Sequence, residues 1–283
     1  MGASKRKPIR RKSSKKKSSA KVFWRGLLIA ITVLLFVGVT SYHYRDALAY
    51  YFSFKSRHTT FPEGTSKVSE ARIYQILKKY PEKMYGIDVS QYQGKIEWEQ
   101  VRAIEDSFPV SFALIRATAG KNLLDKQFER NWEQSKQNKL IRGAYHYYRP
   151  NENSIQQANN FIKYVRLESG DLPPVLDIEN LPKTQSIDSL RVGLKRWLAK
   201  VEDHYKVKPI IYSGESYYKD FLQKDFKGYT FWIANYNFFV EDIKDEWTFW
   251  QFTEKGVVQG IKSPVDLNIY NGTPKMLQYL TVK

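Results

Sequence analysis

The chain has 283 residues, enough for one domain of about 200 residues with extra segments, or for two small domains. It carries 46 Lys and Arg residues against 29 Asp and Glu residues, a net charge of +17. Cysteine is absent, which excludes a disulfide scaffold, a Cys-ligated metal site, a thiol nucleophile and a cysteine-linked lipid anchor. The 7 Trp, 20 Tyr and 16 Phe indicate either a well-filled core or a cleft that stacks against flat apolar faces such as sugar rings.

The basic excess is concentrated at the N-terminus. Residues 1–25 hold 11 basic residues and no acidic one, so the remainder has 35 basic against 29 acidic residues. A segment this rich in Lys, Arg and Ser cannot bury enough apolar surface to fold, and we interpret it as a basic cytoplasmic tail. Nucleic-acid binding is the alternative, but the hydrophobic stretch beside the tail explains its charge, and we predict no nucleic-acid partner.

Residues 26–44 contain no Lys, Arg, Asp or Glu, and at about 1.5 Å per residue they match a hydrocarbon core of about 30 Å. Aromatic residues flank both ends, as in an interfacial belt. With the basic tail on the N-terminal side, the positive-inside rule predicts a single-pass helix in the bacterial cytoplasmic membrane and an exported remainder, periplasmic or extracellular. The alternative is a cleaved signal peptide, because residues 47–49 (ALA) have the small-x-small pattern of a cleavage site.

Residues 45–80 form a polar connector that we interpret as a stalk. Within it, apolar residues at helical spacing predict a short amphipathic helix over residues 68–80, which Pro81 ends. The predicted folded domain then covers residues 81–283.

Eight short runs rich in β-branched and aromatic residues recur after Met84, and helical patterns separate the early ones. Strands that alternate with helices predict a parallel sheet, and eight strands predict closure into an α/β barrel. Only twelve residues without helical periodicity precede the last run, so we expect an irregular (β/α) barrel with fewer than eight helices and an antiparallel last strand. The runs are residues 85–89, 112–118, 143–148, 175–179, 210–213, 231–235, 248–252 and 265–269.

Four acids are predicted to converge where such barrels carry their chemistry, at the C-terminal ends of the parallel strands. Asp88 lies near the end of the first run, Asp177 and Glu179 close the fourth, and Asp266 begins the antiparallel last run, whose start lies at the same face. Four neighbouring carboxyl groups cannot all ionise at low cost, so at least one should stay protonated near neutral pH. A protonated acid beside an ionised one is what glycosidic bond cleavage requires.

A D-x-E pair is by itself a weak motif, because acids at strand ends also bind metals such as Mg²⁺. His146 could contribute a ligand, but the four histidines show no ligand spacing, and we predict no metal and no cofactor. The chain also lacks the glycine-rich phosphate-binding patterns and the G-x-S-x-G nucleophile elbow.

Eight motifs, in the right order from about residue 84 to residue 272, resemble those of the family 25 glycoside hydrolases, lysozymes of the Chalaropsis and endolysin type. Each motif is weak alone, and the eight together are specific. They are YGIDVSQYQG at residues 85–94, FALIRATAG at 112–120, the D..F..N pattern of Asp125, Phe128 and Asn131, GAYHY at 143–147, LPPVLDIE at 172–179, WIANY at 232–236, WQF at 250–252 and VDLN at 265–268.

The resemblance implies an N-acetylmuramidase that cuts the β-1,4 bond between N-acetylmuramic acid and N-acetylglucosamine in peptidoglycan, with a catalytic domain over residues 81–283. Carried over residue by residue, it makes Glu179 the general acid, while Asp177 either orients the substrate's 2-acetamido group or helps to activate water. Asp88 and Asp266 hold the charge balance and position groups. The Cα atoms of acids at i and i+2 of a strand lie about 6.5–7 Å apart, which leaves the retaining and the inverting route both open.

Five aromatic residues at or near strand ends are candidate sugar-stacking walls, with core packing as the alternative for each. Arg116 is a further candidate for substrate binding, unless it pairs with one of the acids of the rim. The expected partners are glycan strands of peptidoglycan and a lipid bilayer around residues 26–44, and the chain is expected to be a monomer. The five aromatic candidates are Tyr147, Tyr212, Trp232, Tyr236 and Trp250.

Two other functions fit parts of the sequence. A glycan-binding module with the same barrel would not need an acid poised for proton transfer, so the intact Asp177 and Glu179 pair argues against it. An enzyme acting on chitin would carry a longer D-x-x-D-x-D-x-E run, of which only the final D-x-E is present.

Overall fold

The computed structural model describes residues 18–45, 48, 67–237, 239 and 242–283. Most of the predicted basic tail, part of the suggested cleavage site and most of the connector therefore lie outside the described residues.

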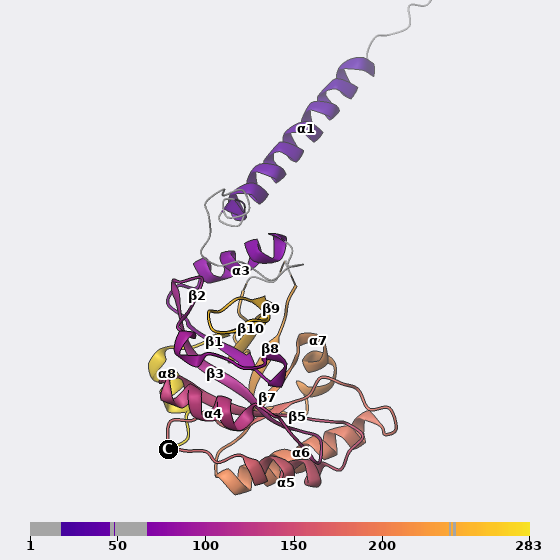
Figure 1. Ribbon diagram of the computed structural model, residues 1–283. Helices are drawn as coiled ribbons and strands as arrows, with labels where there is room; N and C mark the ends of the chain where they lie inside the picture. Colours follow the sequence, from indigo (N-terminus) through magenta and orange to yellow (C-terminus); the bar gives the residue numbers. More distant parts are fainter. Residues whose placement is uncertain (1–17, 46–47, 49–66, 238, 240–241) are drawn as a thin grey trace, which may run out of the picture.

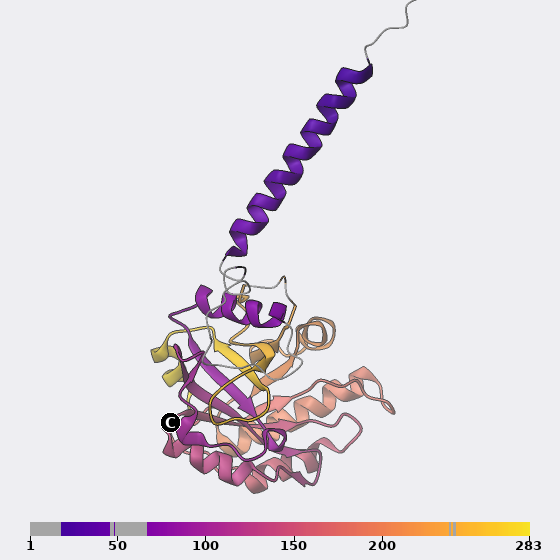
Figure 2. The ribbon, with the colours of Figure 1, turned by 45° about the horizontal axis from the view of Figure 1, so that its top comes forward.

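The N-terminal helix α1, Ser18–His43, coincides with most of the predicted membrane span. Its segment Val22–His43 is long and apolar enough to cross a membrane by length and composition, and none of that apolar window is buried by the protein. Figures 1 and 2 show α1 apart from the barrel. An uncovered apolar helix of this length is compatible with a membrane anchor.

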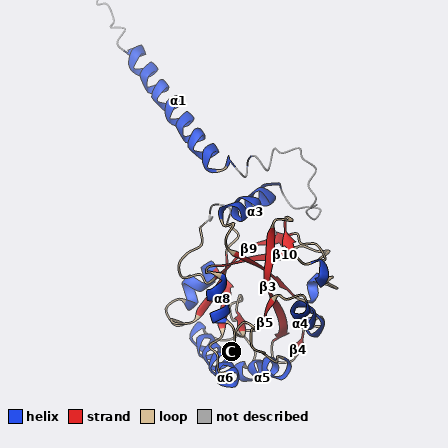
Figure 3. Cartoon of the chain, turned by 90° about the vertical axis from the view of Figure 1, so that its left-hand side faces the viewer, coloured by secondary structure: helices blue, strands red, loops and turns tan. Residues whose placement is uncertain are grey.

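Eight strands close into a barrel, as predicted (Figure 3). Seven of them pair in parallel in chain order, and the last, β10, lies between β9 and β1 and is antiparallel to both. The predicted antiparallel return of the last strand is thus confirmed. The strands are β1 (Met84–Val89), β3 (Phe108–Ala119), β5 (Ile141–Tyr147), β6 (Val175–Asp177), β7 (Ile210–Gly214), β8 (Thr230–Ala234), β9 (Phe249–Gly256) and β10 (Val265–Tyr270).

The helices are irregular, and over the described part of the chain there are fewer than eight, as expected. Side-chain caps start several of them: Asn153 accepts a hydrogen bond from the backbone N–H of Gln156, and Thr273 caps a helix whose first residue is proline. Two short strands, β2 (Ala103–Ile104) and β4 (Leu123–Leu124), pair with β3. The helices that follow β1 are α4 (Phe128–Gln137), α5 (Ser154–Tyr164), α6 (Ile187–Tyr205), α7 (Glu215–Tyr217), the π-helical turn Tyr218–Leu222 and α8 (Pro274–Leu280), with 3₁₀ turns at Gln91–Gln93 and Trp98–Gln100.

Alternation along the strands divides the buried side chains into two clusters. On β3, Phe112 and Leu114 belong to the cluster inside the barrel, whereas Ala113 and Ile115 belong to the layer between barrel and helices. The same period of two holds on β1, where Ile87 packs in the outer layer and Asp88 faces the interior. A residue's parity on its strand therefore decides whether it can reach the barrel mouth.

The helix α3, Lys67–Lys79, corrects the predicted domain boundary. The expected amphipathic helix forms, but Ile73, Ile76 and Leu77 are fully buried in the outer layer, where α3 packs against β9. Full burial stabilises by about 1.5–3 kcal/mol for each such side chain, so this apolar face holds the helix on the barrel. Residues 67–79 thus belong to the folded domain and not to a free stalk.

Candidate active site

The C-terminal ends of the parallel strands surround an open cavity of about 720 Å³. All four acids singled out in the sequence line it: Asp88 from β1, Asp177 and Glu179 from β6 and the residues after it, and Asp266 from β10. They form two pairs, and in each pair the carboxyl groups interact directly.

Asp88 and Asp266 face each other across the β1–β10 pairing. The side-chain amides of Asn268 and Gln251 donate to Oδ2 of Asp88 at 2.8 and 2.7 Å. Burial raises the pKa of Asp88 to about 6, although these two donors act in the opposite direction. Burial, followed by the charge of Asp88, raises the pKa of Asp266 to about 9. At neutral pH this pair therefore carries one negative charge, on Asp88, and keeps a proton on Asp266.

Asp177 and Glu179 both turn toward the cavity because Ile178 between them packs into the outer layer, where its N–H donates to the carbonyl of Tyr212 at 3.0 Å. Asp177 is buried, and Glu179 is the one open to the cavity. Burial and then the neighbouring charge of Glu179 raise the pKa of Asp177 well above its ordinary value. Burial also raises the pKa of Glu179, so both carboxyl groups of this pair hold a proton more readily than isolated acids do.

The structure places four of the five aromatic candidates along the cavity and corrects the fifth. Trp250 is fully buried in the outer layer, close to Trp247 and Phe252, and its indole donates to the carbonyl of Asn235 at 3.1 Å. The reason is strand alternation, since the next residue on β9, Gln251, faces the cavity and Trp250 must then face the helices. Trp250 is a core residue and not a sugar-stacking wall.

Two of the remaining aromatic residues hold Gln251 in place. The hydroxyl of Tyr212 donates to Oε1 of Gln251 at 2.7 Å, and the hydroxyl of Tyr236 donates to the same oxygen. With its acceptor occupied in this way, the amide must present its N–H group to Asp88. Tyr212 is buried, whereas Tyr236 is 43% exposed and lines the cavity.

Trp232 acts on Asp88 through Asn268. Its indole N–H donates to Oδ1 of Asn268 at 2.7 Å, which directs the amide nitrogen of Asn268 to Asp88. The Trp232 side chain is buried within the barrel, beneath the cavity that it helps to line. Tyr147 is half-buried, and its hydroxyl accepts a hydrogen bond from the side-chain amide of Asn180 at 2.6 Å.

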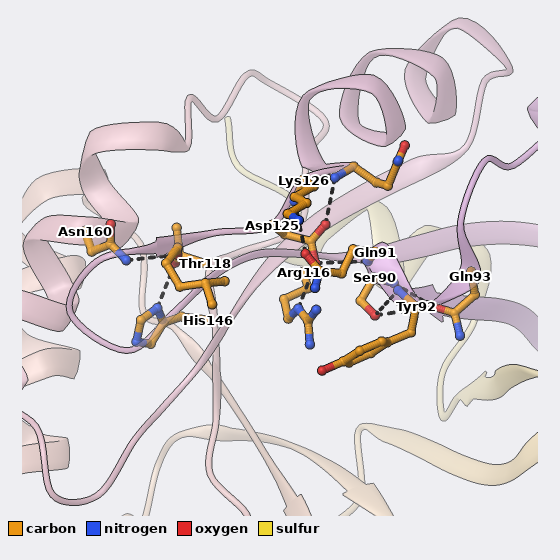
Figure 4. A network of polar contacts seen from close by, with 12 residues as sticks. Ser90, Gln91, Tyr92, Gln93, Arg116, Thr118, Asp125, Lys126, His146 and Asn160 are labelled. Carbon is orange, nitrogen blue, oxygen red and sulfur yellow. Dashed lines mark hydrogen bonds and ion pairs between the residues drawn. The ribbon is translucent and has the colours of Figure 1, made fainter.

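Arg116 lines the cavity, but its partner is Asp125 and not one of the four cavity acids (Figure 4). Its Nε donates to Oδ2 of Asp125 at 2.8 Å, and the same oxygen accepts the backbone N–H of Gln91 at 2.9 Å. The guanidinium lies 4.7 Å from the ring centroid of Tyr92. Its positive charge acts against the raised pKa of Asp177.

Sequence reasoning missed two amides that organise the site. Gln251 lies inside the WQF motif and Asn268 inside the VDLN motif. Asn268 is two residues after Asp266 on the same strand and therefore faces the same side, and this spacing could have identified it. His146 is a core residue between Thr118 and Gln157, and burial lowers its pKa to about 3 (Figure 4). In the described part of the chain no group of three or more His, Cys, Asp or Glu residues could hold a metal ion.

Carboxyl groups with raised pKa values, crowded at the mouth of a barrel, suit the hydrolysis of glycosidic bonds, which needs one protonated and one ionised acid. The family model described as "Glycosyl hydrolases family 25" matches residues 87–261, and the chain belongs to this family. The resemblance inferred from the eight motifs is therefore confirmed.

Curated relatives and solved structures agree with this assignment. The chain is 42% identical over 197 residues to the "Uncharacterized protein YegX" of Escherichia coli K12, covering 69% of this chain and 72% of that protein. It is 34% identical over 208 residues to Lysozyme M1 of Streptomyces globisporus, and the match covers 68% of this chain and 69% of that protein. A solved lysozyme from Streptomyces coelicolor matches with a TM-score of 0.63 and 31% identity, covering 70% of this chain and 97% of that one. The protein is accordingly a glycoside hydrolase of the lysozyme type.

Proposed function

We propose that this lysozyme hydrolyses the β-1,4 bond between N-acetylmuramic acid and N-acetylglucosamine in peptidoglycan, with Glu179 as the general acid. The observation that carries the proposal is the pair formed by Asp177 and Glu179. The pKa of each acid is raised, first by burial, which favours the protonated form that a general acid needs, and Glu179 is the partner open to the cavity, where a glycosidic oxygen can reach it.

Asp177 is suited to act on the sugar rather than on the leaving oxygen. Its Oδ1 is buried and accepts no hydrogen bond from any donor among the residues that the structure describes. Asp177 also lines the cavity beside Glu179. Asp177 would then orient the acetamido group as an internal nucleophile or help to activate water.

The other predicted site residues form the walls and the electrostatic setting. Asp88 supplies the negative charge of the second pair, and Asp266 keeps the proton of that pair. Tyr147 and Tyr236, two of the partly exposed tyrosines that line the cavity, would stack against sugar rings. Arg116, with its charge close to Asp177, would favour the anionic form of that acid.

The proposal includes a membrane tether. Helix α1 would span the cytoplasmic membrane once, with the basic N-terminus inside and the catalytic domain exported as a monomer. Between His43 and Lys67, where α3 begins to pack on the barrel, the chain can span at most roughly 80 Å even when fully extended. The domain would therefore act on glycan close to the outer face of the membrane.

Purified peptidoglycan provides the test of the bond. After digestion and borohydride reduction, mass analysis of the fragments should find reduced N-acetylmuramic acid at the new ends. The Glu179→Gln variant should release at least about a hundredfold fewer new ends than the wild type. New ends that carry reduced N-acetylglucosamine would show cleavage of the other β-1,4 bond.

Membrane fractionation provides the test of the tether. The full-length protein should stay in the membrane pellet through high-salt and carbonate washes. A soluble mature form that starts near residue 50 would show instead that the helix belongs to a cleaved signal peptide.

A further inference from the structure

Arg72 lies in α3, ahead of the first residue that the family model matches. It is only 6% exposed, and its guanidinium donates to three main-chain carbonyls of the barrel. Nη1 donates to the carbonyl of Phe252 at 2.5 Å, Nε to that of Asn237 at 3.2 Å and Nη2 to that of Asn235 at 3.4 Å. One side chain of α3 thus contacts both β9 and the segment that follows β8.

These carbonyls flank the two partners of a hydrogen bond at the active site. Tyr236 stands between Asn235 and Asn237, and Gln251 directly precedes Phe252. The hydroxyl of Tyr236 donates to Gln251, and Gln251 donates to Asp88 at 2.7 Å. The Arg72 guanidinium therefore fixes the main chain next to both partners of the Tyr236–Gln251 hydrogen bond. This hydrogen bond orients the Gln251 amide toward Asp88.

The segment after β8 depends on such contacts, because residues 235–237 have left the regular strand. The backbone N–H of Asn235 donates to the carbonyl of Gln251 at 3.1 Å, and the Trp250 indole donates to the carbonyl of Asn235. The Arg72 guanidinium lies 5.9 Å from the Trp250 ring centroid, within range of a cation–π interaction. The buried Trp250 and Arg72 together hold the outer side of this segment.

Arginine is the residue type that this geometry requires. Its planar guanidinium presents five N–H donors in a fixed fork, so it can serve three carbonyls in different directions. A lysine ammonium on a flexible stem keeps the charge but not the fork. The charge is buried against the carbonyl dipoles, which makes the position sensitive to substitution.

We propose that Arg72 is a positioning residue of the active site, which fixes the main chain at Tyr236 and Gln251 so that Gln251 keeps its hydrogen bond to Asp88. The inference rests on the proposed function, since glycan hydrolysis is its first readout. It extends the catalytic unit beyond the family domain to the helix that follows the connector to α1.

Loss of the Arg72 contacts has a consequence that simple destabilisation lacks. The Gln251 amide lowers the pKa of Asp88, so a displaced amide lets this pKa rise above about 6 and moves the acidic limb of the pH–activity profile to higher pH. The variants below do not substitute any of the other titratable groups that face Asp88, and of these groups only Tyr236 lies in the segment that Arg72 holds. These groups are Asp177, Glu179, Asp266, Tyr145, Tyr212 and Tyr236.

The test uses the full-length protein in detergent, with Arg72→Ala, Arg72→Lys and Leu77→Ala as a matched control. Leu77 is fully buried on the same helix, so its truncation weakens α3 packing but leaves the guanidinium in place. We expect Arg72→Ala to lower kcat/KM on peptidoglycan about 10- to 100-fold, the range for a misplacement of about 1 Å at a catalytic site. Its acidic limb should shift upward, and low millimolar guanidinium should restore part of the activity.

Arg72→Lys should lower kcat/KM and shift the acidic limb upward, as Arg72→Ala does. The lysine variant provides the test if the alanine variant does not fold. Leu77→Ala should keep the wild-type pH profile and gain nothing from guanidinium. The proposal is overturned if the Arg72 variants keep the wild-type profile, or if Leu77→Ala reproduces their shift. If the wild type releases no ends from peptidoglycan, the proposed function fails on its own. The pKa of Asp88, followed by carboxyl ¹³C NMR without substrate, then still decides the role of Arg72.

Discussion

Replacement of Asp266 by Asn should make the stability of the protein less dependent on pH. In the folded state the pKa of Asp266 is raised to about 9, against about 3.9 for an aspartate in an unfolded chain. Between these two values the folded protein binds a proton at this site that the unfolded chain has lost. The free energy of unfolding therefore falls as pH rises from about 4 to about 9, and asparagine removes this loss.

The size of the effect follows from linkage. One extra bound proton in the folded state changes the free energy of unfolding by about 1.4 kcal/mol per pH unit, or at most about 4 kcal/mol from pH 5 to pH 8. Asp266 borders the open cavity and interacts with Asp88, so solvent screening and proton sharing reduce this value. From pH 5 to pH 8, the free energy of unfolding of Asp266→Asn should rise by about 1–3 kcal/mol relative to that of the wild type.

Denaturant unfolding of the detergent-solubilised protein, followed by tryptophan fluorescence at pH 5, 6.5 and 8, measures this difference. Asp220→Asn is the matched control, because Asp220 is exposed at the surface. The advantage of Asp266→Asn over the wild type should grow steadily with pH, while the control should stay parallel to the wild type. A constant difference between Asp266→Asn and the wild type across the three pH values would refute the retained proton.

Three further outcomes test other parts of the site and fold. The wild-type enzyme should show a bell-shaped pH profile that is insensitive to EDTA, with an acidic limb near the pKa of about 6 of Asp88; a rate still climbing past pH 9 would contradict this. Trp250→Leu should lower the free energy of unfolding by about 2–4 kcal/mol in denaturant unfolding, because the ring is fully buried in the core; an unchanged free energy of unfolding would contradict that placement. Gly86→Ala should lower the free energy of unfolding by about 1–3 kcal/mol, because its Cβ would lie 2.3 Å from the Phe112 ring; an unchanged melting temperature would contradict that packing.

The parts of the fold that depend on local pattern were predictable from the sequence. Eight β-rich runs, short connections and a missing last helix led to a closed barrel with an antiparallel final strand. The direction of that strand then placed Asp266 beside Asp88 without any knowledge of the site. Strand ends in a barrel share one face, so positions in the chain become positions in the cavity.

Two errors have physical causes. The amphipathic pattern of residues 68–80 predicts a helix with one apolar face, but not the surface that covers this face, and so the docking of α3 on β9 was missed. Trp250 was assigned to the cavity by its place near a strand end, although alternation along β9 gives that side to Gln251. Contacts between distant segments, such as Arg72 with Asn235, leave no local signal at all.

The division of roles between Glu179 and Asp177 is the central claim, and a leaving-group comparison tests it most directly. Glu179→Gln and Asp177→Asn would be assayed on peptidoglycan and on a nitrophenyl glycoside, whose leaving group needs little protonation. On peptidoglycan, the rate of Glu179→Gln should fall by about 10²–10⁴-fold, which is the usual contribution of a general acid. On the activated glycoside Glu179→Gln should recover most of its rate, while Asp177→Asn should stay impaired on both substrates. Recovery by Asp177→Asn but not by Glu179→Gln would contradict the account.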